Sequence, residues 1–188
     1  MFPLIRRPRA WAGAIAGVLA LVAPSVGAHA SPLPSPLPSP LPSHWLSANT
    51  MARTATLTLI AGYNNALAGF NFDGYGKGAM VVSIPAGYRV TVVYQNKGQY
   101  PHSVLVTPYA KKDLETGWPL AFPGAATTDP EDGSSPGAAQ RFSFIADKVG
   151  TYAIICAVGG HEQAGMWEVL RVTRGGKPSV TINSRHKA

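Results

Sequence analysis

Short segments in which apolar and polar residues alternate, separated by glycine and proline, make up most of the chain from residue 54 onward. A period of two is typical of a β-strand with one face against a core. The segments are residues 54–60, 79–84, 88–94, 103–107, 140–146, 150–156 and 166–173. No window predicts an amphipathic helix longer than two turns. The pattern therefore predicts an all-β domain, built as a sandwich or a barrel.

One connection breaks the regular spacing of these strands. Residues 108–139 make a connection of about thirty residues, which is long for a compact domain and indicates a functional or family-specific role. A short helix is expected within it, near residues 109–115. After residue 173 the strand pattern weakens, although residues 179–182 favour one further strand at a sheet edge.

The N-terminal part of the chain has a different character. Residues 1–30 hold three arginines, then an apolar run, then small residues, as is typical of a signal peptide. The run is shorter than the about 20 residues of a standard membrane-spanning helix, so cleavage is favoured over an N-terminal membrane anchor. Residues 31–50 are a Ser/Pro/Leu-rich spacer whose repeated prolines favour an extended chain. We expect the folded domain to span residues 51–175 and a basic tail to span 176–188.

Composition limits the partners that the domain can have. Charged residues make up 13% of the chain, hydrophobic residues make up 46%, and the formal net charge is +7. The positive excess lies at the two ends of the chain, because residues 31–170 hold eight basic and nine acidic side chains. A domain without a concentrated basic surface is not expected to bind nucleic acid. The single cysteine excludes an intramolecular disulfide and is available to a metal.

The cysteine opens a motif with the ligand order of a blue-copper site. Cys156, His161 and Met166 follow one another at five-residue steps, on a glycine-containing loop between two predicted strands. A thiolate, an imidazole and a weak thioether are donors that favour one-electron copper chemistry. Taken singly, each residue has an ordinary interpretation as a core thiol, a surface histidine or a core methionine. Their order on one loop favours the metal site.

A blue-copper site needs a second histidine from elsewhere in the chain. His29 lies in the export segment, His44 in the spacer and His186 near the C-terminus. His102 stands at the start of a predicted core strand and is the remaining candidate. Ser103 follows it directly, and its hydroxyl is a candidate support for the metal site, with an exposed strand serine as the alternative.

These motifs resemble the cupredoxins, and most of all sulfocyanin and its rusticyanin-like relatives. The resemblance covers about residues 54–173 and rests on the runs 70–74 (Phe-Asn-Phe-Asp-Gly), 84–88 (Ile-Pro-Ala-Gly-Tyr), 101–103 (Pro-His-Ser) and 156–167. The four-residue gaps on both sides of His161 are found in sulfocyanin and rusticyanin. The resemblance implies a Greek-key β-sandwich that holds one type 1 copper through His102, Cys156, His161 and Met166. Ser103 follows the first histidine as in rusticyanin, where sulfocyanin-like sequences often have asparagine, so both subfamilies stay open.

The expected function is that of an exported electron-transfer protein with one copper ion, in the periplasm or on the outer face of the cytoplasmic membrane. It would shuttle one electron between respiratory-chain partners such as a cytochrome and a terminal oxidase. We expect a monomer that is not an enzyme, with membrane association through the N-terminus as an open alternative.

Three other functions are alternatives to electron transfer. The first is a copper-binding accessory or chaperone protein, against which the low methionine content argues, with four in the chain. The second is a copper-enzyme domain such as that of a nitrite reductase or a multicopper oxidase, which would need further copper ligands. The third is a cupredoxin-like domain without metal, which the presence of all four ligand candidates disfavours.

Overall fold

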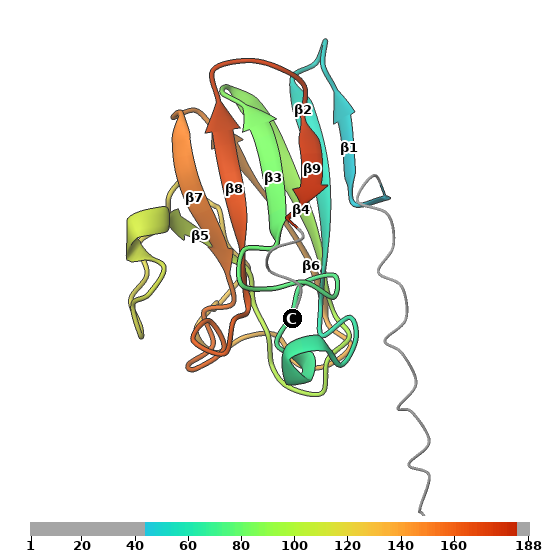
Figure 1. Ribbon diagram of the computed structural model, residues 1–188, viewed down its shortest axis with the longest axis vertical. Coiled ribbons are helices and arrows are strands. Elements are labelled where there is room, and N and C mark those ends of the chain that lie inside the picture. Colours follow the sequence, from blue (N-terminus) through green and yellow to red (C-terminus); the bar gives the residue numbers. More distant parts are fainter. Residues whose placement is uncertain (1–43, 184–188) are drawn as a thin grey trace, which may run out of the picture. The chain divides into compact units, whose positions relative to one another are not determined.

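The strands form two sheets that pack face to face (Figure 1). The computed structural model describes residues 44–183. The four-stranded sheet has the order β1-β2-β4-β6, and the five-stranded sheet has the order β5-β7-β8-β3-β9. β2 runs parallel to β4 and β3 runs parallel to β8, whereas the other neighbours are antiparallel. The bounds are β1 Leu46–Asn49, β2 Thr54–Ala61, β3 Met80–Pro85, β4 Tyr88–Asn96, β5 Leu105–Pro108, β6 Ala139–Ala146, β7 Gly150–Ile155, β8 Trp167–Thr173 and β9 Ser179–Ile182.

The core lies between the two sheets and follows the predicted alternation. Every second side chain of β2 and β4 is buried, and the parallel register sets Leu57 beside Val92. From the other sheet, Val82, Ile154 and Leu170 join the same buried cluster. Burying an aliphatic side chain of this size is worth about 1.5–3 kcal/mol relative to leaving it exposed. The alternation in the sequence is therefore what drives the two sheets together.

The prediction of an all-β Greek-key sandwich is confirmed. Each strand predicted from alternation is present, with ends that differ by no more than two residues, and residues 179–182 form β9 at the edge beside β3. The sequence pattern does not predict β1, because three of its four residues are exposed and it carries no apolar alternation. The neighbouring Trp45 is buried in the core, so packed residues occur within the segment 31–50 that the sequence indicates as spacer.

The long connection between β5 and β6 packs against the five-stranded sheet. Its backbone is bonded to the β5 region, with the N–H of Val106 donating to the carbonyl of Ala125 at 2.9 Å and the N–H of Thr127 donating to that of Val104 at 2.9 Å. Phe122 enters the main core, while Trp118 joins a second buried cluster with Leu105, Ala153, Ile155 and Ala157. The connection therefore covers the face of this sheet that points away from the other sheet.

Helices contribute little to the part of the chain that the structure describes. The helix predicted near residues 109–115 is only one 3-10 turn, η3 (Tyr109–Lys111), and a second such turn, η2 (Ala66–Gly69), follows β2. Within residues 44–183 no helix is both long and apolar enough to cross a bilayer. The predicted export segment 1–30 and most of the predicted spacer lie outside the described residues.

Candidate metal centre

The ligand candidates gather at one end of the sandwich, at the lower end in Figure 1. His102 lies just before β5, Cys156 directly after β7, and Met166 directly before β8. These three strands are neighbours in one sheet, and β5 pairs antiparallel with β7, so the start of β5 meets the end of β7. His161 lies in the loop between β7 and β8, which is drawn in orange. The sheet order thus brings together residues that are up to 64 positions apart.

Three donor atoms converge at this end. Sγ of Cys156 lies 3.8 Å from Nδ1 of His102 and 3.4 Å from Nδ1 of His161, and the two nitrogens are 3.2 Å apart. Donor atoms that share one metal ion at about 2.0–2.3 Å lie about 3–4 Å from one another. The separations therefore fit a single ion, and a soft thiolate with two imidazoles fits copper.

The loop that carries His161 is folded back by its own backbone. The N–H of His161 donates to the carbonyl of Val158 at 3.0 Å, and the N–H of Met166 donates to the carbonyl of His161 at 2.9 Å. The N–H of Cys156 in turn donates to the carbonyl of Met166 at 3.0 Å. Gly165 has a φ of 104°, a conformation that a residue with a side chain rarely adopts. Met166 is fully buried and is held next to the two loop donors by these bonds.

Ser103 forms hydrogen bonds with Cys156 and with the residue that follows it. Its N–H donates to Sγ of Cys156 at 3.3 Å, and its hydroxyl oxygen accepts the N–H of Ala157 at 2.9 Å. Ser103 is fully buried, so the alternative of an exposed strand serine is wrong. The hydroxyl joins the His102 segment to the Cys156 segment.

Burial sets the protonation of the donors. It lowers the pKa of His102 from 6.5 to about 4, with the charge of His161 adding to the effect, and it also lowers the pKa of His161. Both rings are therefore neutral at pH 7, which is the form that binds a metal. Burial raises the pKa of the Cys156 thiol, although N–H groups of Val158 and Ser103 oppose the rise. The thiol must lose its proton when a metal binds, so binding weakens as the pH falls.

Asn96 and Ser134 hold His102 in place, although neither is a candidate site residue in the sequence. The side-chain amide of Asn96 donates to the carbonyls of Ser134 and Tyr100, each at 2.8 Å. Ser134 and His102 exchange two backbone hydrogen bonds of 3.1 and 2.7 Å. One signal for Asn96 exists, because it continues the inward-facing alternation of β4 as a polar residue. Ser134 comes from the long connection and has no such signal.

An aromatic pair lies against the histidines. The ring of Phe70 is 4.7 Å from the ring of His161 and is stacked on Tyr100 at 6.0 Å, measured between centroids. Tyr100 is 52% exposed, whereas His102 and Cys156 are fully buried. The half-buried His161 is therefore the donor nearest to solvent, with Phe70 beside it.

The other histidine candidates take no part in the described site. His44 is exposed at the start of the described residues, and His29 and His186 lie outside them. The structure thus brings together His102, Cys156 and His161, with Met166 adjacent, as the sequence predicts.

The chain is similar to a known family over most of its length. Residues 43–180 match the family model of the Sulfocyanin (SoxE) domain. Sulfocyanin of Sulfolobus acidocaldarius is 30% identical over 125 residues, and the aligned part is 63% of this chain and 63% of that protein, less than two thirds of its length.

Two solved structures align with the chain. Reduced auracyanin of Roseiflexus castenholzii is 22% identical with a TM-score of 0.45, over 63% of this chain and 96% of that chain. Rusticyanin of Thiobacillus ferrooxidans is 17% identical with a TM-score of 0.43, over 69% of this chain and 86% of that chain. The cupredoxin family binds one type 1 copper. Ser103 leaves the sulfocyanin-like and rusticyanin-like subfamilies open, and the family match favours sulfocyanin. The chain belongs to the sulfocyanin family of cupredoxins.

Proposed function

We propose that this protein is an exported electron carrier with one type 1 copper, bound by His102, Cys156 and His161 and, more weakly, by Met166. It passes one electron between respiratory-chain partners, such as a cytochrome and a terminal oxidase. The observation that carries the proposal is the convergence of two imidazole nitrogens and one thiol sulfur within 3.2–3.8 Å at the end of a rigid sheet. Bound copper would supply a one-electron couple between the cuprous and cupric states.

The chain's own residues suit a carrier whose geometry changes little between the two states. Cys156 and Met166 are tied to each other by a backbone hydrogen bond, and each adjoins a strand of the same sheet. Ser103 donates to the sulfur and so favours the thiolate. Burial of His102 and Cys156 keeps water from the donors, while the edge of His161 offers the shortest route for the electron to a partner.

The burial of the donors also argues against the alternative functions. A copper chaperone must exchange its metal with other ligands, and two of the three converging donors here are fully buried. A copper enzyme needs ligands beyond one type 1 set, and residues 44–183 present one His/Cys/Asp/Glu group that could hold a metal. The absence of enzymatic activity, the monomeric state and export stay predictions.

The test is to add Cu(II) to the purified full chain and to record its visible absorption. The expected result is a strong thiolate-to-copper band for the unaltered chain and its loss in Cys156→Ser, which keeps the size of the side chain. Met166→Leu should keep the band and change the reduction potential, because a weak axial ligand tunes the potential. A chain that takes up copper without such a band would refute the proposal.

A further inference from the structure

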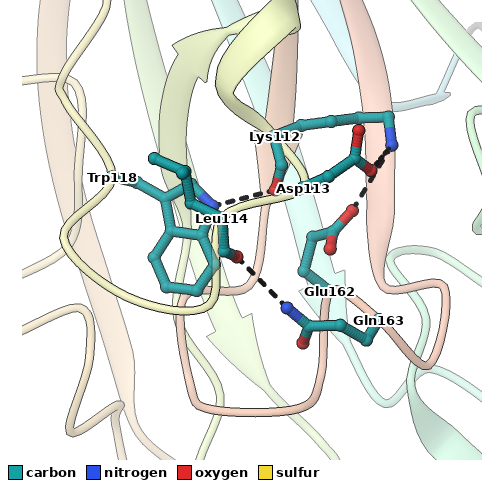
Figure 2. A network of polar contacts seen from close by, with 6 residues as sticks. All are labelled: Lys112, Asp113, Leu114, Trp118, Glu162 and Gln163. Atoms are coloured by element: carbon teal, nitrogen blue, oxygen red, sulfur yellow. Dashed lines mark hydrogen bonds and ion pairs between the residues drawn. The ribbon is translucent and has the colours of Figure 1, made fainter.

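A buried ion pair lies beside the loop between β7 and β8, residues 156–166, which is called the metal loop below (Figure 2). Neither member of the pair is a ligand candidate. Nζ of Lys112 is 3.7 Å from Oε1 of Glu162, which directly follows the ligand candidate His161. The side chains of Lys112 and Glu162 are only 13% and 3% exposed. Lys112 also pairs with the exposed Asp113, and its ammonium lies 4.4 Å from the centroid of the Trp167 ring, next to Met166. One cation therefore touches residues adjacent to two of the four proposed ligands.

One neutral hydrogen bond joins the same two segments, and a second lies within the connection. Nε2 of Gln163 donates to the carbonyl of Leu114 at 3.1 Å, and the indole N–H of Trp118 donates to the carbonyl of Lys112 at 2.8 Å (Figure 2). Trp118 is itself anchored in the second buried cluster on the sheet. The segment after η3 is thus fixed to the sheet by Trp118 and to the metal loop by Lys112 and Leu114.

The charges matter because the pair is shielded from water. A buried carboxylate that loses its cation is strongly destabilised, whereas an exposed pair contributes about 0–1 kcal/mol. A charge near a metal also acts on the metal's two oxidation states, because the cupric ion carries one more positive charge than the cuprous ion. A nearby cation favours the cuprous state, and a nearby anion favours the cupric state.

We propose that Lys112 is a positioning residue for the metal loop. By pairing with Glu162 it holds residues 161–166 against the long connection, and its charge raises the reduction potential of the copper site. This inference rests on the proposed function, since it concerns the same copper site. It predicts that the connection, which supplies no ligand, helps to set the properties of the centre.

Potentiometry of the copper-loaded full chain tests the electrostatic part. Lys112→Met, which keeps the aliphatic stem, should lower the potential, and Glu162→Gln should raise it. The double variant should shift the potential less than either single variant, and Lys112→Arg should restore most of the parent value. The matched control is Lys111→Met, since Lys111 is the exposed neighbour and should leave the potential unchanged. Shifts of the same sign in the two single variants, or no shift in either, would overturn the inference.

Hydrogen exchange of the metal-free chain tests the positioning part without any copper. The amides of Ala164 and Gly165 donate within the loop at 3.0 and 2.8 Å, so they report its opening. Their exchange should be several-fold faster in Lys112→Met and unchanged in Lys111→Met. Unchanged exchange in Lys112→Met would overturn the inference even if the parent binds copper. Failure of the parent to form a blue site would refute the proposed function, but the hydrogen-exchange comparison of the metal-free chains would still stand.

Discussion

Two buried carboxyl groups, one in the connection between β2 and β3 and one in β8, should make the stability of this domain fall as the pH rises. Oδ1 of Asp73 accepts the N–H of Ile60 at 2.9 Å, and Oε2 of Glu168 accepts the N–H of Met80 at 2.7 Å. The second oxygen of each group has no hydrogen-bond partner among the described residues. Burial raises the pKa of both well above the ordinary value, against the effect of these N–H groups, and the charge of Asp73 raises the pKa of Glu168 further.

The sign follows from comparing the folded and unfolded chains. Above about pH 5.5 the unfolded chain has lost both protons, while the folded chain keeps them until the pH approaches its raised folded-state pKa values. The stabilising effect of the protonated groups is therefore complete below the unfolded pKa values and is lost as the pH rises toward the folded values. Each retained proton contributes a slope of about 1.4 kcal/mol per pH unit, and two give about 2.7.

Urea unfolding of the metal-free chain at pH 5.5–7 measures this slope, with Asp73→Asn and Glu168→Gln as neutral replacements of similar shape. The pKa values of His102 and His161 are lowered, so these rings destabilise the fold as the pH falls and oppose the carboxyl effect. The slope is therefore read from the difference in the free energy of unfolding between the parent and the double variant. The histidine contribution is the same in both chains and cancels in this difference. Exposed Asp132→Asn is the control. A difference that does not change with pH would refute the reasoning.

Three further predictions concern the site and its support. Ser103→Ala leaves a buried backbone N–H without its acceptor and should lower the free energy of unfolding by about 1–3 kcal/mol in urea titrations; equal stability would contradict the contact seen here. Trp118→Ala removes the largest side chain of the second cluster and should cost about 3–5 kcal/mol in thermal unfolding, and a loss below about 0.5 would place the ring outside the packed structure. A Cβ at Gly98 would lie 2.7 Å from Nε2 of His102, so Gly98→Ala should change the blue absorption band. Gly159→Ala should not change it, because a Cβ at Gly159 meets no atom within 4 Å. Equal spectra for both variants would contradict the assignment of His102 as a ligand.

The sandwich could be predicted because its strands are amphipathic along their own length. In β2 and β4 the burial of alternate residues is a local property, so it is visible in the sequence before any partner strand is known. The ligand candidates of the loop could be predicted for the same reason, since Cys156, His161 and Met166 belong to one continuous segment. His102 needed only elimination, because the other three candidate histidines lie in the predicted export segment, in the predicted spacer and near the C-terminus.

The long connection could not be interpreted in this way, since the contacts that anchor it to the sheet and to His102 are distant in sequence. Trp118 covers a sheet face whose existence depends on three other strands, and Ser134 bonds to His102 across 32 positions. The short 3-10 turn η3 also replaces the predicted helix, because the chain leaves it at once to place Trp118 on the sheet. Polar residues such as Lys112 carry no periodic signal at all.

These distant contacts change the view of what holds the centre rigid. The sheet fixes the positions of Cys156 and Met166, which adjoin the ends of β7 and β8. The connection bonds to His102 through Ser134 and to the metal loop through Lys112 and Leu114. A loop that carries a ligand between two strands could otherwise move about its glycines. Since the connection contacts both histidine-bearing segments, it opposes motion of one imidazole relative to the other. We therefore expect the connection, which supplies no ligand candidate, to be as necessary to a centre of fixed geometry as the strands that flank the ligand candidates.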